Sequence, residues 1–251
     1  KILTIHGIYS EQIGMLHGTL SSKLSNKFEK NAFSWADAVT AGSKEAFDYY
    51  SKLGSKVFFV PNAIDIKSLP SGFDTKYEKQ IIFAGRLSKE KGILTILETA
   101  KSLPKDVHLI IIGTGPEENI VIESAKNLEN VHFLGYQPKE KTIPLIRGSI
   151  LLIQPSFAEG ISATLLESMA CKTPIIATNI GGNKELFVHN KTGILIEPGN
   201  SNELLKEIMR MLNDQNLRDE IARSAYDTVQ KYDWSNVGQL YLDLYEKLLK
   251  S

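Results

Sequence analysis

The sequence is poor in cysteine, in long apolar runs and in net charge. Its 251 residues include one cysteine, Cys171, which excludes an internal disulfide framework and is expected, in its apolar context, to be a buried thiol. No apolar run approaches the roughly 20 residues of a membrane-spanning helix, and no signal peptide is visible. Twenty-nine basic residues balance 29 acidic ones, which argues against a nucleic-acid-binding protein. We therefore expect an intracellular, cytoplasmic protein.

The chain has enough apolar residues for a sizeable core, since 42% of its residues are hydrophobic. Its first part contains three strand-like stretches, KILTIH, WADAVTAG and KVFFVP, with a helix expected from about Ser43. Lys1 already lies in the first of these strands, and three strands hardly make a complete α/β domain. We therefore expect a fragment that lacks a natural N-terminal portion.

Six short apolar stretches alternate with amphipathic ones from residue 80 onward. They are QIIFAGRL, VHLIIIGTG, NVHFLGY, SILLIQPS, TPIIATNI and TGILIEPG. Fully apolar strands separated by helices indicate a parallel sheet that is covered on both faces. The sequence therefore predicts an α/β fold with a doubly wound, Rossmann-like domain, whose ligands bind beyond the carboxyl ends of the strands.

The last 50 residues read as helices, the first of them capped by Asn200 or Ser201 and the last with its own apolar stripe. The polar, turn-rich stretch LPSGFDTKYEK suggests a domain boundary. We predict a partial N-terminal domain over 1–75, a Rossmann-like domain over 76–232 and a C-terminal helix over 233–251.

The stretch FAGRLSKEKGI, residues 83–93, has the composition of an anion site. A strand ends at Gly85, where a ligand could approach the backbone closely, and Arg86 and Lys91 follow around a helix start. A planar guanidinium and a mobile ammonium together suit a diphosphate. The alternative, two solvated loop cations, stays open on this stretch alone.

The stretch IIIGTGPEE, residues 110–118, superficially suggests a dinucleotide fingerprint. Its third glycine position is Glu118, whose carboxylate would repel a pyrophosphate. We reject an NAD site and expect Gly113 and Gly115 to form a tight turn from strand to helix.

The stretch AEGISATLLESMA, residues 158–170, places two carboxylates around a segment that resembles core. With a helix starting near Gly160, Glu159 and Glu167 would be separated by about 12 Å along its axis. An elongated ligand would fit, such as a sugar, a diphosphate and a ribose in a row, with the sugar at Glu159, the ribose at Glu167 and the phosphates on the amides of 160–164. The alternative is a loop carboxylate and an exposed helix carboxylate.

Two further candidates lie at strand ends. Gly181 and Gly182 follow the next strand in NIGGNKELF and could line the same crevice. His6 ends the N-terminal strand, where a histidine facing a cleft is a candidate ligand.

The motifs FAGRLSKEKG, IIGTGP, VHFLGY, PSFAEGISATLLESMACKTPIIATNIGGNKELF and TGILIEPGN occur in the order seen in retaining glycosyltransferases of family 4. The segment WADAVTAGSKEAFDYYSKLGSKVFFVPNAID resembles that family's exit from its N-terminal domain, so the resemblance covers nearly the whole chain. It implies a GT-B fold of the group 1 glycosyltransferase type, truncated at its N-terminus. One Rossmann-like domain would serve the acceptor and the other a nucleotide-sugar.

The resemblance also implies residue roles. Arg86 and Lys91 would hold the diphosphate, Glu167 the ribose and Glu159 the donor sugar, which His6 would reach from across the cleft. We predict Glu159 and His6 as catalytic residues, and a donor site formed by Gly85, Arg86, Lys91, Gly113, Tyr136, Gly160, Ile161, Ser162, Ala163, Thr164 and Glu167. The family generally needs no metal and the chain has no D-x-D motif, so no metal and no cofactor are expected.

The implied reaction moves a sugar from a UDP- or GDP-sugar to a hydroxyl acceptor, a sugar or a lipid-linked one, in glycan or glycolipid synthesis. The alternatives are a non-catalytic donor-binding module or subunit, and, more remotely, a sugar-nucleotide epimerase. Contact with the inner face of a membrane is left open through the missing N-terminal part. The chain departs from the family at Ile161 and Ser162, where an aromatic residue and a glycine are usual, and at Ala63, usually glycine.

Overall fold

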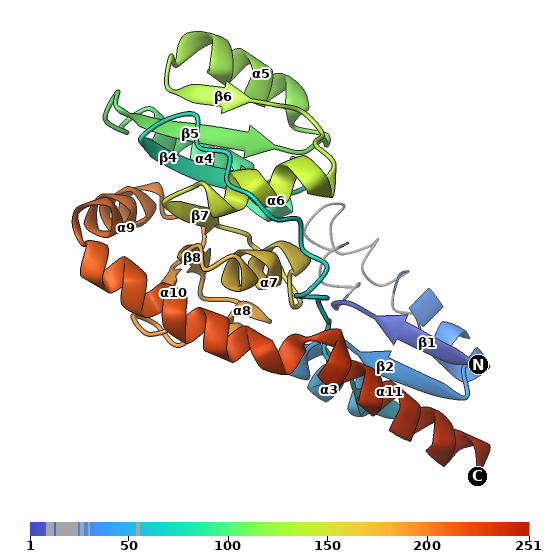
Figure 1. The fold of residues 1–251 in the computed structure, drawn as a ribbon. Helices are drawn as coiled ribbons and strands as arrows, with labels where there is room; N and C mark the ends of the chain where they lie inside the picture. The colour runs from blue at the N-terminus through green and yellow to red at the C-terminus, as the bar shows by residue number, and fades with distance from the viewer. Residues whose placement is uncertain (9–12, 14–24, 26–27, 30, 54–55, 251) are drawn as a thin grey trace.

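The computed structural model describes residues 1–8, 13, 25, 28–29, 31–53 and 56–250, which form two parallel sheets with flanking helices (Figure 1). The smaller sheet has the order β1-β2-β3, from β1 (Ile2–Ile5), β2 (Ala38–Ala41) and β3 (Val57–Phe59). Ser43 caps α3 (Lys44–Ser51) by accepting a hydrogen bond from the amide of Ala46. The three N-terminal strands and this helix are confirmed.

The larger sheet contains the six strands predicted from the apolar stretches. They are β4 (Lys79–Ala84), β5 (Val107–Ile112), β6 (Val131–Phe133), β7 (Leu151–Gln154), β8 (Ile175–Thr178) and β9 (Ile194–Ile196). All pair in parallel, in the order β6-β5-β4-β7-β8-β9. This is the strand order of a doubly wound Rossmann-like sheet, which confirms the predicted fold class.

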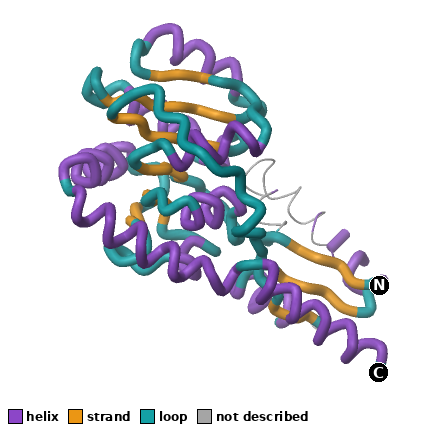
Figure 2. Tube along the Cα trace, viewed as in Figure 1, coloured by secondary structure: helices purple, strands orange, loops and turns teal. Residues whose placement is uncertain are grey.

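Both faces of the larger sheet are buried because successive strand residues point to opposite sides. Ile81 and Phe83 pack with α4 (Ile93–Ala100), α5 (Glu118–Asn127) and α9 (Ser201–Asn213). Ile82 and Ala84 pack with α6 (Lys139–Arg147), α7 (Ala163–Ala170), α8 (Asn183–Leu186) and α10 (Gln215–Val229). In Figure 2 the strands of each sheet run side by side and helices flank them.

The C-terminal helix returns to the smaller sheet. After η2 (Gln230–Tyr232), the amide of Trp234 donates to the carbonyl of Ile64, whose own amide donates to Tyr232. From there α11 (Trp234–Leu249) runs back toward the smaller sheet (Figure 1), where the ammonium of Lys247 lies 5.2 Å from the ring centre of Phe58 in β3.

Two residues of the α11 stripe, Val237 and Leu244, are buried, whereas Leu240 is 43% exposed. Among the described helices, none combines the length and the apolar character needed to cross a bilayer.

Three rings stack at the amino-terminal ends of β5 and β6. Tyr77 lies 3.9 Å from His108 and 4.4 Å from His132 between ring centres, and the two histidines share a hydrogen bond of 2.9 Å. Burial lowers the pKa of His132, and the neighbouring His108 and Lys76 lower it further.

This stack predicts a loss of stability in acid. Because the pKa of His132 is lower in the folded chain, the unfolded chain binds the proton first as the pH falls below about 6.5. We expect the melting temperature of the wild type to fall from about pH 8 to about pH 5, and to fall less in His132→Phe, which keeps a ring in the stack. Equal pH slopes in the two proteins would contradict the assignment.

Candidate functional site

A cavity of about 500 Å³ lies at the carboxyl ends of β4 and β5. The strand order reverses between β4 and β7, and ligands of such sheets bind at this point. We call it the sheet-edge cavity; it is lined by Ala84, Gly85, Arg86, Ile112, Gly113, Thr114, Gly115, Pro116, Tyr136, Gln137, Thr142 and Thr164. Five of the predicted donor-site residues are in this set: Gly85, Arg86, Gly113, Tyr136 and Thr164.

The floor of this cavity requires a glycine at residue 113. Gly113 has a φ of +137°, and a Cβ atom there would lie 1.8 Å from the carbonyl oxygen of Gly85. The amide of Gly113 donates to the carbonyl of Gly135, which ties the ends of β5 and β6 together. The tight turn predicted from IIIGTGPEE therefore shapes the cavity directly.

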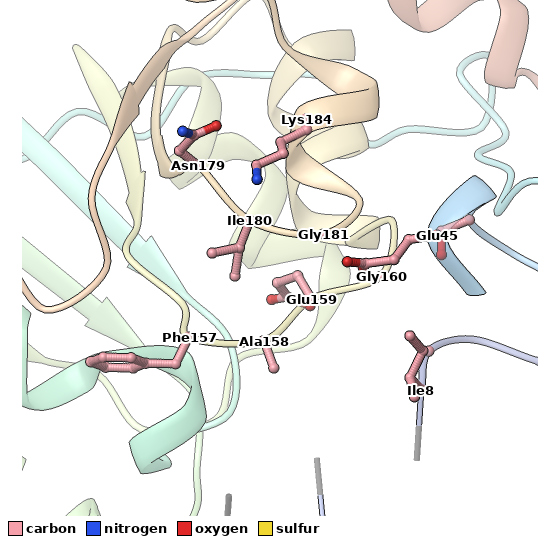
Figure 3. Close-up of a pocket in the computed structure, with 12 residues that line it drawn as sticks. Ile8, Glu45, Phe157, Ala158, Glu159, Gly160, Asn179, Ile180, Gly181 and Lys184 are labelled. Carbon is pink, nitrogen blue, oxygen red and sulfur yellow. The ribbon is translucent and has the colours of Figure 1, made fainter. Parts of the chain in front are cut away.

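A second cavity, of about 260 Å³, lies where the N-terminal part of the chain meets the larger domain. We call it the junction cavity; its lining comprises Gly7, Ile8, Ser43, Glu45, Phe157, Ala158, Glu159, Gly160, Asn179, Ile180, Gly181 and Lys184. In Figure 3 the side chain of Glu45 extends toward the loop of Glu159 and Gly160. Gly181, predicted for the same crevice, lies here beside Glu159.

Lys91 and Glu159 form an ion pair of 2.6 Å. The side chain of Glu159 is 7% exposed and that of Lys91 26% exposed. The same oxygen of Glu159 accepts hydrogen bonds from the amide of Gln154 and from the hydroxyl of Ser156, at 3.1 Å in the second case. The predicted cationic loop and the predicted carboxylate stretch therefore meet, and one carboxylate oxygen of Glu159 accepts from three donors.

The start of α7 differs from the prediction. The helix begins at Ala163, not near Gly160, because Ser162 is extended, with φ −73° and ψ 129°. The preceding loop is held from outside: the amide of Gly182 donates to the carbonyl of Glu159, and Asn62 donates to that of Ile161. Ser162 does not cap α7 with its side chain, and no side chain of the described residues accepts from the amides of the helix's first turn.

The predicted residues of this segment therefore differ in surroundings. The side chain of Ile161 is 3% exposed and belongs to the core, so only its backbone can meet a ligand. Ala163 is exposed at the first turn of α7, and the hydroxyl of Ser162 donates to the side-chain oxygen Oε1 of Gln154 at 3.3 Å.

Glu167 lies beside the sheet-edge cavity without lining it. It is one turn along α7 from Thr164, and it pairs at 3.2 Å with Lys139, which is one turn along α6 from Thr142. Thr142 and Thr164 both line the cavity. The ion pair of Glu167 and Lys139 thus lies one helical turn from two residues that line the cavity. The sequence did not predict Lys139 as part of the site.

Cys171 is a buried thiol at the end of α7, as predicted, and is 8% exposed. Burial raises its pKa, partly offset by the nearby guanidinium of Arg147. The thiol therefore stays protonated, which is typical of a structural cysteine.

His6 is exposed and adjacent to the junction cavity, which its neighbours Gly7 and Ile8 line. Its Nδ1 atom lies 2.9 Å from the amide oxygen of Asn62. A Cβ atom on Gly160 would lie 2.1 Å from the carbonyl oxygen of His6. The end of β1 therefore packs directly against the loop that carries Glu159, although the two are about 150 residues apart in sequence.

Glu185 joins the two parts of the chain at the same junction. Its two carboxylate oxygens accept from the amides of Lys44 and Glu45 at 2.9 and 3.0 Å, at the start of α3. A carboxylate is favoured there because the first amides of a helix have no partner within the helix. Neither Glu185 nor Asn62 was predicted, since each acts on residues distant in sequence.

The amino-acid sequence matches the family model of the glycosyl transferases group 1 over residues 69–228. An uncharacterized glycosyltransferase, MJ1178, of Methanocaldococcus jannaschii is 26% identical and aligns with 98% of this chain and 68% of its own length. A phosphatidyl-myo-inositol mannosyltransferase of Mycobacterium leprae is 26% identical over 79% of this chain and 56% of its own length. This chain thus aligns with only 56% to 68% of the length of these two relatives.

Solved structures show the same fold. Anabaena Alr3699/HepE, in complex with UDP and glucose, has a TM-score of 0.80 at 23% identity, covering 98% of this chain and 71% of its own. Sucrose-phosphate synthase of Thermosynechococcus elongatus has a TM-score of 0.84 at 22% identity, covering 99% and 68%. The predicted GT-B fold is confirmed. Since the family model matches more than half of its residues, the chain belongs to the glycosyl transferases group 1.

Proposed function

We propose that the chain binds a nucleotide-diphosphate sugar across the two cavities and transfers the sugar to a hydroxyl acceptor with retention of configuration. One observation carries the proposal: the loop from Arg86 to Lys91 connects the linings of the two cavities. Arg86 lines the sheet-edge cavity, and Lys91 bonds Glu159, which lines the junction cavity. The cations of one short loop thus lie where an extended anionic ligand would cross from one cavity to the other.

In this arrangement the nucleoside occupies the sheet-edge cavity. The diphosphate meets Arg86, Lys91 and the amides at the start of α7, which favour an anion. The ribose hydroxyls donate to the carboxylate of Glu167, which also forms an ion pair with Lys139. The sugar extends into the junction cavity beside Glu159, and the proposal requires no metal and no organic cofactor.

The reaction breaks the bond between the sugar's C1 atom and the phosphate oxygen, whose electron pair stays on the diphosphate. A bond forms between C1 and the acceptor oxygen on the same face, and the leaving phosphate takes the acceptor's proton. Charge therefore grows on the diphosphate, where Arg86, Lys91 and the α7 amides stabilise it. Fixed charges of this kind usually provide the largest part of catalysis.

The comparisons support the donor class, because the structure of Alr3699/HepE contains UDP and glucose. We propose a UDP- or GDP-sugar as donor and a sugar or lipid-linked hydroxyl as acceptor, in glycan or glycolipid synthesis. We also propose an intracellular site of action, consistent with a single buried thiol.

Donor binding is tested by calorimetry with UDP, GDP and their sugars. We expect Arg86→Ala and Glu167→Ala each to weaken the preferred nucleotide by about tenfold or more, because each removes a charged contact. Arg223→Ala, an exposed arginine on α10 away from both cavities, is the matched control and should bind normally. Unchanged affinity in both site variants would refute the donor site.

Transfer is tested separately from binding. Single-turnover incubation of the chain with the preferred donor should release nucleotide and form a glycoside with retained configuration. Binding without any transfer or donor hydrolysis would instead identify a donor-binding module that needs another chain.

A further inference from the structure

Asn62 forms hydrogen bonds on both sides of the junction. Its Nδ2 atom donates to the carbonyl of Ile161 at 2.6 Å, and its Oδ1 atom lies 2.9 Å from Nδ1 of His6. Asn62 belongs to the segment after β3, and Ile161 to the loop that carries Glu159. One side chain therefore links the end of β1, the end of β3 and the loop before α7.

The orientation of this amide follows from its neighbours. A carbonyl oxygen can only accept, so the contact with Ile161 requires the NH₂ group of Asn62 on that side. The oxygen of Asn62 must then face His6, and it too can only accept. The hydrogen between the two residues therefore belongs to Nδ1 of His6.

The backbone around Asn62 leaves little room for another arrangement. A Cβ atom on Gly42 would lie 2.7 Å from Oδ1 of Asn62, so the glycine admits the amide at this place. The amide of Gly42 itself donates to the carbonyl of Ile5, the residue before His6. Asn62 is thus packed against the strand end that positions the imidazole.

We infer that Asn62 is a positioning residue that sets the tautomer of His6. With the hydrogen on Nδ1, the neutral imidazole keeps its lone pair on Nε2, which acts as a hydrogen-bond acceptor. Such an atom recognises a hydroxyl group, of the donor sugar or of the acceptor, and not a phosphate or a carbonyl. The identity of that ligand rests on the proposed function, whereas the tautomer does not.

The test is the tautomer itself, measured by nitrogen-15 NMR of the full chain labelled at its five histidines. The two ring nitrogens give distinct shifts according to which carries hydrogen, and His6→Gln assigns the signal. At alkaline pH, where imidazoles are neutral, we expect His6 to be mainly the Nδ1–H form. A His6 that is mainly the Nε2–H form in the wild type overturns the inference without any variant.

Two variants at Asn62 separate the tautomer from the tie to Ile161. Asn62→Leu removes both hydrogen bonds, and His6 should lose its preference for Nδ1–H. Asn62→Asp keeps an acceptor facing His6 but loses the donor to Ile161, so the Nδ1–H form should persist. His108, His132 and His189 serve as internal controls for folding. An unchanged tautomer in Asn62→Leu would also overturn the inference.

Activity provides an independent readout. If His6 acts through this tautomer, Asn62→Leu and His6→Ala should each lower kcat by roughly ten- to a hundredfold, and the double variant should lose no more than the stronger single one. Additive losses would contradict a shared role. Failure of the wild type to transfer sugar would count against the proposed function and leave the NMR result to decide the tautomer.

Discussion

Replacing Lys91 by alanine is expected to lower the rate of sugar transfer by about a hundred- to a thousandfold, the usual effect of losing one preorganised charge at a developing anion. Lys91 lies on the loop that also carries Arg86. Its ammonium pairs at 2.6 Å with Glu159, which lines the junction cavity. Its ammonium would face the diphosphate as the leaving group gains charge. A single-turnover assay at saturating donor measures the effect on the chemical step.

The matched control is Lys101→Ala. Lys101 also pairs with a glutamate, Glu98, but its side chain is 62% exposed and remote from the cavities. Exposed pairs contribute little, so transfer should remain at the wild-type rate. A wild-type rate in Lys91→Ala would remove Lys91 from the catalytic machinery.

Loss of Lys91 also affects folding, which must be separated from catalysis. It leaves the carboxylate of Glu159, 7% exposed, without its cation, and breaking a buried pair in this way costs up to about 3–5 kcal/mol. The partial exposure of Lys91 places the expected loss toward the lower end. The double variant Lys91→Ala, Glu159→Gln should regain stability but not transfer, whereas recovery of both would show that the loss was structural.

Gly92→Ala is expected to cause a large loss of stability at this site. Gly92 has a φ of +71°, and a Cβ atom there would lie 1.9 Å from the carbonyl oxygen of Pro155. Because both atoms are tied to the backbone, the loop carrying Lys91 and the loop carrying Glu159 would have to separate. We expect the free energy of unfolding to fall by about 2–4 kcal/mol, from left-handed strain plus overpacking.

Gly135→Ala isolates the strain from the clash. Gly135 has a similar φ of +64°, and no atom of the described residues lies within 4 Å of its added Cβ. Its cost should be the strain alone, about 1–2 kcal/mol. Urea unfolding of both variants measures the difference. Equal losses in the free energy of unfolding would show that the close contact between residue 92 and Pro155 does not affect stability.

The sequence predicted the larger sheet correctly, and several of its candidate site residues lie together in the structure. Buried parallel strands read as uninterrupted apolar runs, so β4 to β9 were found where the runs occur. Ligand sites of such sheets form at the carboxyl ends of strands, so Arg86, Gly113 and Thr164 were predicted for one site and line one cavity. The motif resemblance supplied their roles, which stay predictions.

The prediction from local sequence was wrong where contacts with distant residues determine the backbone conformation. The apolar run after Gly160 suggested an immediate helix, but hydrogen bonds from Asn62 and Gly182 hold the loop extended as far as Ser162, and α7 begins at Ala163. The side chain of Ile161 is in the core, so the predicted contact with the donor can come only from its backbone amide.

The sequence by itself determined which residues form the strands of the larger sheet and where charged residues concentrate, because these depend on neighbours along the chain. Only the tertiary structure decided that Lys91 pairs with Glu159, that Glu185 caps α3 and that Asn62 joins His6 to Ile161. Each of these contacts joins residues between 56 and 141 positions apart, from His6 and Asn62 to Lys44 and Glu185. A hydrogen bond depends on distance and direction in space, and the strand order that brings its partners together leaves no mark on either partner's local sequence.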